Sequence, residues 1–382
     1  MNAVSISIAP RIALQSLRTL APAVALCALL TAGDNKELVL PGTASTDLTW
    51  PLPPDPPRVK WLAEYTDMAK VKKPEVKKIS WLDRVTGTKT PEEKQELRKP
   101  YGITADSRGR IYTADTELKT VFIFDPVNRT VETRESTSRA PLALPAGVAL
   151  DANDRLFVSD AELHTIICYS PSGQPLAHFG MASLGRPGGI AIDRQRNRLY
   201  VADAKNSTIA VFGTKTLDYE GAIGRPSTAG KREPGTLAGP TNVAIDRAGN
   251  LFVADTGNYR VQVFDSTGKF IRSFGAQGDR PGEFIRPKGI ATDSEGHVYV
   301  ADAEFNNFQI LSPEGQPLLA VGTLGGGKGE FALIAGIYVD SRDRIYTTEM
   351  FRGRIQVFQY IPQAATSGGP AGGKEAKATK AH

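Results

Sequence analysis

Residues 240–275 read PTNVAIDRAGNLFVADTGNYRVQVFDSTGKFIRSFG and contain four short apolar stretches separated by polar turns. Apolar residues alternate with others within the stretches, as at Val261 and Val263, and this is the period of a β-strand rather than of a helix. Glycines such as Gly249 and Gly268 mark the turns. We therefore expect four antiparallel strands, at Asn242–Asp246, Asn250–Ala254, Arg260–Phe264 and Phe270–Phe274.

The same unit occurs six times between residues 99 and 362. Each copy begins its first strand with a small anchor residue, and successive anchors lie 42 to 53 residues apart. A single four-stranded sheet cannot bury both of its faces, whereas six sheets that pack radially can. The repeat therefore predicts an all-β fold, a six-bladed β-propeller of four-stranded antiparallel blades. The anchors are Gly102, Gly147, Gly189, Asn242, Gly289 and Gly336.

The sixth copy lacks a fourth strand, because its third strand, Arg354–Phe358, is followed by a tail rich in Gly, Ala and Lys. One apolar segment before the first copy, Val59–Tyr65 (VKWLAEY), has the pattern of a fourth strand. An unpaired blade edge would invite aggregation. We therefore expect Val59–Tyr65 to pair with Arg354–Phe358 and to close the ring.

The unit resembles the NHL repeat, both in the stretch quoted above and in PKGIATDSEGHVYVADAEFNNFQIL from Pro287. The resemblance covers residues 99–360, and the chain looks most like the exported bacterial propellers of this family. It implies the six-bladed fold without implying one activity, since NHL propellers include substrate-binding modules of ubiquitin ligases, RNA binders and a zinc-dependent peptide-amidating lyase. Related six-bladed families include lactonases, so function has to be argued from a site.

The charge distribution argues against a nucleic-acid partner. The net charge of the chain is +5, but residues 101–362 hold 28 basic and 29 acidic residues, so the excess lies in the flanks. A nucleic-acid-binding domain concentrates positive charge in the fold itself. The two cysteines, Cys27 and Cys168, are too few for a disulfide scaffold or a four-cysteine zinc site.

Residues 1–32 have the pattern of a secretory signal peptide. Arg11 and Arg18 precede the uncharged run TLAPAVALCALLTA, and no acidic residue occurs before Asp34. We expect export to the periplasm or the cell envelope, with a lipid anchor at Cys27 as the alternative to soluble release. The remaining expected segments are a Pro-rich lead-in at 33–57, the closing strand at 58–66, a basic linker with short helices at 67–98, the propeller at 99–362 and a disordered tail at 363–382. The linker leaves peripheral contact with an anionic membrane surface open as an alternative to docking on the ring.

Two columns of carboxylates repeat through the blades, and we expect both to cap turns by accepting backbone N–H bonds. Cys168 falls in an apolar column and is expected to be a buried thiol. The four histidines are scattered, and only His164 falls in a face loop, so no catalytic zinc site is expected. We expect no catalytic residue and no cofactor, with an unassigned metal ion in the central channel left open. The columns are Asp106, Asp151, Asp193, Asp246, Asp293 and Asp340, and Asp115, Asp160, Asp203, Asp255, Asp302 and Glu349.

Strand direction brings the hairpins between second and third strands to the same face as the start of each blade. Loops on a rigid ring usually carry the binding function, and the channel mouth on this face, expected to be lined by Tyr101, Thr241 and Lys288, is mildly basic and suits an acidic peptide or an anion. The candidate binding residues are Tyr101, Lys119, His164, Arg186, Arg260, Lys288, Asn306, Arg352 and Arg354. We expect a monomeric exported scaffold that binds a protein or peptide through this face. The alternative is a propeller enzyme, similar to the amidating lyases or the lactonases, that uses the channel mouth.

Overall fold

The computed structural model describes residues 48–66, 96–228 and 232–362. Within these ranges the regular secondary structure is β-strand, apart from one short 3-10 turn at Thr256–Asn258. No helix among the described residues is long and apolar enough to cross a membrane. The signal segment, most of the basic linker and the tail lie outside the described residues, as do the predictions made for them.

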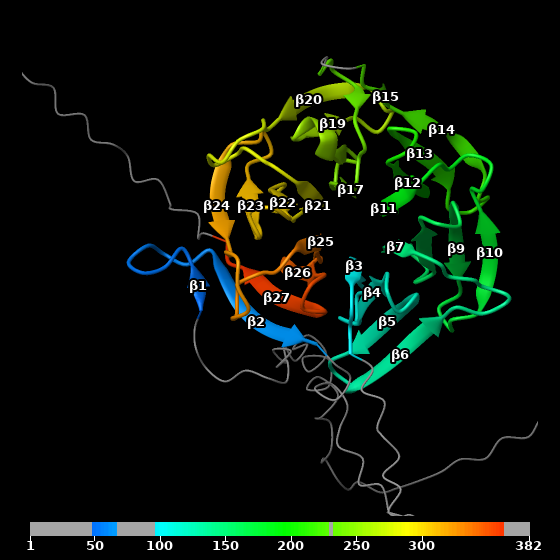
Figure 1. Ribbon diagram of the computed structural model, residues 1–382, viewed down its shortest axis with the longest axis horizontal. Helices are drawn as coiled ribbons and strands as arrows, with labels where there is room; N and C mark the ends of the chain where they lie inside the picture. Colours follow the sequence, from blue (N-terminus) through cyan, green and yellow to red (C-terminus); the bar gives the residue numbers. More distant parts are fainter. Residues whose placement is uncertain (1–47, 67–95, 229–231, 363–382) are drawn as a thin grey trace, which may run out of the picture. The chain divides into compact units, whose positions relative to one another are not determined.

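Six sheets are arranged around a central axis, and in each the chain runs from the axis outward (Figure 1). The first three blades are complete four-stranded antiparallel sheets. Blade 1 contains β3 (Pro100–Ala105), β4 (Ile111–Asp115), β5 (Thr120–Asp125) and β6 (Thr130–Glu135). Blade 2 contains β7 (Pro145–Leu150), β8 (Leu156–Asp160), β9 (Thr165–Tyr169) and β10 (Pro175–Phe179). Blade 3 contains β11 (Pro187–Asp193), β12 (Arg198–Asp203), β13 (Thr208–Gly213) and β14 (Tyr219–Ile223).

The next two blades repeat this arrangement after a small parallel ribbon, β15 (Arg225–Pro226) with β16 (Thr236–Leu237), which the repeat pattern does not predict. Blade 4 contains β17 (Asn242–Ile245), β18 (Leu251–Asp255), β19 (Arg260–Phe264) and β20 (Phe270–Phe274). Blade 5 contains β21 (Pro287–Thr292), β22 (Val298–Asp302), β23 (Asn307–Leu311) and β24 (Pro317–Val321). Blade 6 takes three strands from the end of the propeller, β25 (Ile334–Val339), β26 (Arg344–Glu349) and β27 (Arg354–Tyr360).

The fourth strand of blade 6 is β2 (Val59–Tyr65), which pairs with β27 in antiparallel register, Val59 opposite Tyr360 and Tyr65 opposite Ile355. The predicted closure of the ring is therefore confirmed. A further strand, β1 (Thr49–Trp50), extends this sheet to five strands and had no counterpart in the expected pattern. Trp61 of β2 donates its indole N–H to Gln356 Oε1 at 3.0 Å, which fixes the pairing by a side-chain bond as well.

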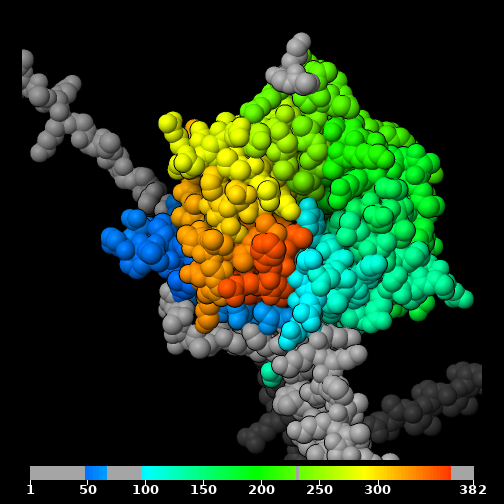
Figure 2. Space-filling model, viewed as in Figure 1, coloured from blue at the N-terminus to red at the C-terminus, as the bar shows by residue number. Residues whose placement is uncertain are grey.

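Apolar clusters fill the spaces between neighbouring blades, and the blades pack side by side around the ring (Figure 2). Between blades 2 and 3, Phe157, Cys168 and Phe212 are all at most 1% exposed. The predicted burial of Cys168 is thus confirmed, and burial raises the pKa of its thiol to about 11. Between blades 5 and 6, the rings of Phe308, Phe331 and Phe358 pack together, so closure by β2 covers an aromatic core.

The first carboxylate column caps turns as predicted, and so does the second column at Asp115, Asp160, Asp203 and Asp302. In the first column, Asp340 Oδ1 accepts the backbone N–H groups of Arg342 and Arg344 at 2.9 and 3.0 Å. In the second column, Asp115 accepts N–H bonds from the hairpin that follows it and also from Arg98 and Lys99, at 2.7 and 3.0 Å. Each of these four carboxylates ties the entry of its blade to the hairpin between the second and third strands, whereas Asp255 and Glu349 accept a backbone N–H at the blade entry and pair with the side chains of Arg260 and Arg354.

Removal of β2 should destabilise the ring. A chain that begins at residue 67 would leave the hydrogen-bonding groups of β27 unpaired and would expose the apolar surface that Val59, Trp61 and Tyr65 now cover. We expect its melting temperature to fall by at least about 10 °C, or the protein to aggregate. Circular dichroism melting would measure this, with a chain that begins at residue 48 as the control that keeps β1 and β2. Equal melting of the two chains would contradict the closure.

Candidate functional site

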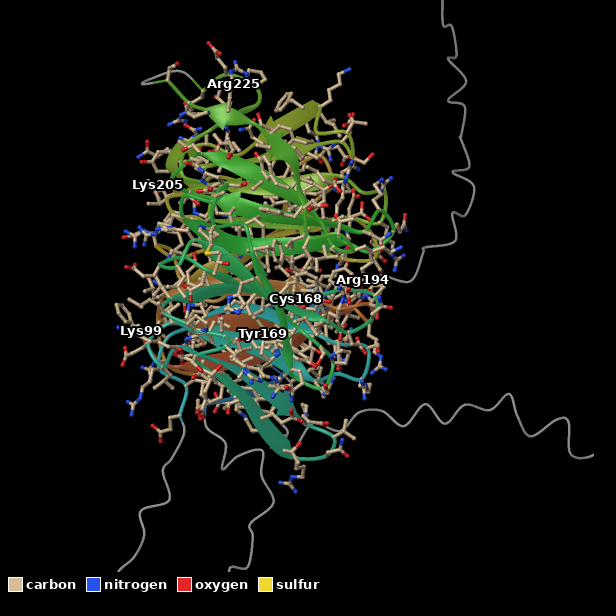
Figure 3. The ribbon with its side chains drawn as sticks, turned by 90° about the vertical axis from the view of Figure 1, so that its right-hand side faces the viewer. Lys99, Cys168, Tyr169, Arg194, Lys205 and Arg225 are labelled. Atoms are coloured by element: carbon tan, nitrogen blue, oxygen red, sulfur yellow. The ribbon has the colours of Figure 1, made fainter. Side chains whose placement is uncertain are left out.

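The propeller has two faces of different construction. The first, here called the loop face, carries the hairpins between second and third strands and the connections that enter each blade. The second, here called the turn face, carries the turns between first and second strands. In the edge-on view, Lys99, Lys205 and Arg225 lie on the loop face and Arg194 lies on the turn face (Figure 3).

Tyr101 and Lys288 meet at the loop-face mouth of the channel. The ammonium of Lys288 in blade 5 lies 5.4 Å from the ring centroid of Tyr101 in blade 1. Burial, together with the nearby charge of Arg286, lowers the pKa of Lys288, and burial raises the pKa of the Tyr101 phenol. The structure therefore brings two predicted residues together as a cation–π pair. No carboxylate among the described residues pairs with Lys288.

Below this mouth the first strands approach one another so closely that the anchor column has no room for side chains in most blades. A Cβ on Gly147 would lie 2.6 Å from the Gly188 carbonyl oxygen, and one on Gly289 would lie 2.7 Å from that of Ala335. Hydroxyl groups of the second strands bridge these crossings, as where Thr348 donates to the Tyr101 carbonyl oxygen at 2.7 Å. Backbone from neighbouring blades thus narrows the channel at this level.

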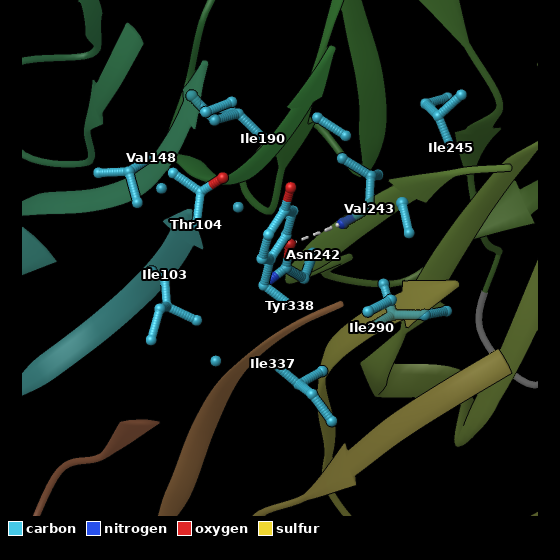
Figure 4. A pocket seen from close by; sticks show the side chains of 18 of the residues that line it. Ile103, Thr104, Val148, Ile190, Asn242, Val243, Ile245, Ile290, Ile337 and Tyr338 are labelled. Carbon is cyan, nitrogen blue, oxygen red and sulfur yellow. Dashed lines mark hydrogen bonds between the residues drawn. The ribbon is translucent and has the colours of Figure 1, made fainter. Parts of the chain in front are cut away.

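The channel beyond the constriction holds a cavity of about 210 Å³, lined mainly by aliphatic side chains, with polar atoms making up about half of the lining surface. The ring of Tyr338, from blade 6, stands among aliphatic side chains of the other blades (Figure 4). Its hydroxyl lies 3.4 Å from the Ala105 carbonyl oxygen, and burial raises its pKa. Asn242 occupies the anchor position of blade 4 and accepts the Val243 N–H at 2.9 Å, so its carbonyl is satisfied locally.

Three candidate residues occupy the same position in their hairpins. Lys119, His164 and Asn306 have φ values of 54°, 54° and 53°, in the left-handed region. Lys119 and His164 are exposed, whereas Asn306 accepts the Leu333 N–H at 2.6 Å and so joins blade 5 to the entry of blade 6. The hairpins therefore display Lys119 and His164 on the loop face, but they hold Asn306 in a structural role.

Arg260 and Arg354, which were predicted to be binding residues, are 6% and 3% exposed. Arg260 pairs with Asp255 at 3.0 Å and donates to the carbonyl oxygens of Arg232, Glu233 and Thr236. Arg354 pairs with Glu349 at 2.6 Å and donates to the carbonyl oxygen of Glu330. Both guanidinium groups are buried in loop-supporting networks, so the structure does not place them where a partner would touch them.

Arg186 and Arg352 are exposed on the loop face, as predicted. The guanidinium of Arg352 lies against Gly326, in the connection between blades 5 and 6. Two exposed apolar residues were not among the predicted binding residues. Phe351, next to Arg352, is 76% exposed, and Leu324, two residues before Gly326, is 73% exposed. Their signal in the sequence is an aromatic and an aliphatic residue in loop segments, where polar residues are usual.

Two of the described histidines, His178 and His297, have hydrogen-bond partners. His178 contacts the Arg139 carbonyl oxygen at 2.8 Å, and His297 contacts Asp293 at 2.8 Å, which raises the pKa of the imidazole. Among residues 48–66, 96–228 and 232–362, no group of three or more His, Cys, Asp or Glu side chains is placed to hold a metal ion.

Arg260→Ala should destabilise the fold by about 3 kcal/mol or more, because it leaves the buried Asp255 carboxylate without its cation and three carbonyl groups without donors. Urea unfolding would measure the loss. Arg186→Ala, at an exposed position of the same face, serves as the control and should change the unfolding free energy by no more than about 0.5 kcal/mol. A similar small effect in both variants would show that Arg260 is not a structural residue.

Comparison with known proteins supports the repeat assignment. A family model described as a 6-bladed beta-propeller matches residues 236–308, and the model of the NHL repeat matches residues 184–212. The human NHL repeat-containing protein 2 is 34% identical over 95 residues, which are 24% of this chain and 13% of that protein. The chain therefore matches only a small part of the length of this curated relative.

Solved structures with the same architecture belong to proteins with different activities. A protein of unknown function from Bacteroides thetaiotaomicron has a TM-score of 0.57 at 18% identity and covers 69% of this chain and 70% of its own. A gluconolactonase from Xanthomonas campestris gives 0.54 at 15% identity, with coverages of 69% and 87%. Virginiamycin B lyase from Staphylococcus aureus gives 0.52 at 12% identity, with 69% and 95%. At these identities the likeness concerns the fold alone, and the chain is a six-bladed β-propeller in which residues 184–212 match the NHL repeat.

Proposed function

We propose that the propeller is a binding scaffold that holds an acidic peptide segment of a partner protein across the mouth of its loop face. The observation that carries this proposal is the Lys288–Tyr101 pair. Lys288 is half-buried, stacks on an aromatic ring and has a lowered pKa. Arg186 and Arg286 lie near it, and both act on the pKa values of the pair. A partly desolvated cation without an internal counter-ion gains most from a carboxylate of a ligand.

An exposed patch beside the mouth suits the rest of such a partner. Phe351, Leu324 and Arg352 project from two adjacent loop segments of blades 5 and 6. Aromatic and arginine side chains dominate the affinity of many protein interfaces. The acidic segment would then bind at the channel mouth, and apolar residues of the partner would pack on Phe351 and Leu324.

We further propose that the protein is exported, works as a monomer in the periplasm or at the envelope, and is either released or tethered through a lipid at Cys27. The support is the charged and then apolar pattern of residues 1–32. Peripheral contact of the basic linker with a membrane surface would be compatible with this location. Such a location also agrees with the absence of a basic excess in residues 101–362.

The alternative function is catalysis at the channel mouth, of the lactonase or lyase type that the names of similar propellers suggest. One observation favours it, since a lysine with a lowered pKa is a usable base or nucleophile. The two functions separate on one variant. Turnover of a lactone by the purified protein, lost in Lys288→Met, would favour the enzyme over the scaffold.

For the scaffold, a ten-residue poly-glutamate peptide should bind the propeller, and the binding should weaken with added salt. The double variant Lys288→Met, Arg186→Ala should bind it at least about tenfold more weakly, because two charge-assisted contacts are lost. Isothermal titration calorimetry would measure this. Lys215→Ala, an exposed lysine in the turn-face loop between β13 and β14, is the matched control. Equal affinity of all three proteins, or equal binding of poly-lysine, would overturn the proposal.

Lys288→Met should not weaken the fold. The folded state lowers the pKa of Lys288 below its unfolded value, so the unfolded chain binds more protons between the two values and stability rises with pH there. Below that window the buried charge costs stability, and its removal should leave the melting temperature at pH 7 equal or higher. Thermal melting at pH 7 would check this. A clear loss of stability would mean that Lys288 supports the ring rather than awaiting a ligand.

Export predicts a processed amino terminus. In a bacterial host the mature protein should be found in the periplasmic or membrane fraction and should begin after residue 32, or at a lipid-modified Cys27. Fractionation followed by mass measurement of the intact protein distinguishes these two forms. Recovery of a chain with an intact Met1 in the cytosolic fraction would exclude export.

A further inference from the structure

The turn face has a second opening of the channel, which the loop-face proposal does not use. A depression of about 290 Å³ lies at this opening. It shares Ile192, Arg194, Ile245, Thr292 and Val339 with the channel cavity, so the two spaces adjoin. Polar groups therefore ring the entrance, and an aliphatic chamber lies directly behind it.

The carboxylates at this entrance have their oxygens occupied. Asp193 and Asp340 each accept backbone N–H bonds and each pair with an arginine, Arg196 and Arg344. Asp293 is held by His297 and by the hydroxyl of Tyr299 at 2.9 Å. Asp246, which has no such cation partner, accepts the backbone and side-chain N–H groups of Asn250 at 2.8 Å each. The neighbouring Asp343 accepts both the backbone N–H and the hydroxyl of Ser294.

Two arginines at this entrance, in contrast, have N–H donors that a ligand could use. Arg194 and Arg247 are exposed, occupy equivalent positions in blades 3 and 4, and line the depression. Arg194 donates its Nε–H to the Leu150 carbonyl oxygen at 3.2 Å, and neither arginine forms an ion pair within the described residues. The positive charge of Arg194 also acts on the pKa of the Tyr338 hydroxyl inside the channel, against the larger rise that burial causes. Because the arginines keep unused N–H donors while the neighbouring carboxylate oxygens already have partners, the entrance favours an anionic ligand.

The chamber behind the entrance selects the rest of the ligand. Its lining side chains include Leu150, Ile192, Ile245 and Val339, with the ring of Tyr338 among them. Its volume of about 210 Å³ far exceeds the ~15 Å³ that one water molecule requires, so a short tail has room beside these side chains. An apolar tail can therefore lie in the chamber while an acid group remains at the entrance.

We propose that the turn face binds a small organic carboxylate. Arg194 and Arg247 hold the carboxylate at the entrance, and a short aliphatic or aromatic tail enters the channel towards Tyr338. The site is on the opposite face from the acidic-peptide site and is independent of it, so either proposal can fail without the other.

The test is calorimetric titration of the full propeller with octanoate and 3-phenylpropionate, each beside its matched amide, and with acetate. Both acids should bind, and the amides and acetate should bind at least about tenfold more weakly, because the amides lack the charge and acetate lacks the tail. Failure of both acids to bind, or equal binding of acid and amide, would overturn the proposal. Acetate as strong as octanoate would overturn the assignment of the channel to the tail.

Variants locate the site. Arg194→Gln with Arg247→Gln should weaken octanoate binding at least about tenfold, whereas Arg342→Gln, an exposed arginine of the same face that does not line the depression, should leave it unchanged. Ala191→Phe places an aromatic ring in the strand position that blade 6 fills with Tyr338 and should block the tail. Circular dichroism checks folding of each variant. Unchanged octanoate affinity in the folded double variant would place the binding elsewhere and overturn the proposal.

Discussion

The close approach of the six first strands around the axis is the constraint on which the rest of the structure depends. At the anchor level the neighbouring backbones leave no room for a Cβ, as at Gly147 and Gly289, and hydroxyl groups such as that of Thr348 bridge one blade to the next. A ring this tight has to be complete, since one missing strand would open an edge and uncover an aromatic core. The pairing of β2 with β27 meets that requirement by bringing together segments almost three hundred residues apart.

The same constraint divides the channel into two openings with different chemistry. On the loop face, Lys288 and Tyr101 lie over the narrow anchor level and present a cation to any partner. On the turn face, the strands end in Asp-capped turns, and the opening leads directly into the aliphatic chamber around Tyr338. Backbone crowding near the loop face thus separates a surface suited to a peptide from a cavity suited to a small molecule.

Arginine has two roles in this fold. Arg260 and Arg354 are buried, and each joins a second-strand carboxylate to the carbonyl groups of a long blade connection. Arg194 and Arg247 follow the first-strand Asp of their blades directly and remain exposed. The position of an arginine in the repeat therefore decides whether its guanidinium supports a loop or faces solvent. The second-strand carboxylate is buried, whereas the turn after the first strand lies at the exposed turn face.

Local pattern in the sequence was enough to predict the strands, the six repeats, the two Asp columns, the burial of Cys168 and the closing strand Val59–Tyr65. Each of these predictions depends on alternation or turn residues within one repeat, or on a count of strands. Such features can be recognised in the sequence without knowledge of how the blades pack. The sequence did not separate Arg260 and Arg354 from Arg186 and Arg352, since all four lie at hairpins or blade entries of the same face and only the folding of long connections over the hairpins buries the first two. It also did not reveal the turn-face cavity, because Arg194, Arg247, Ile245 and Tyr338 come from three different blades and meet only when the ring closes.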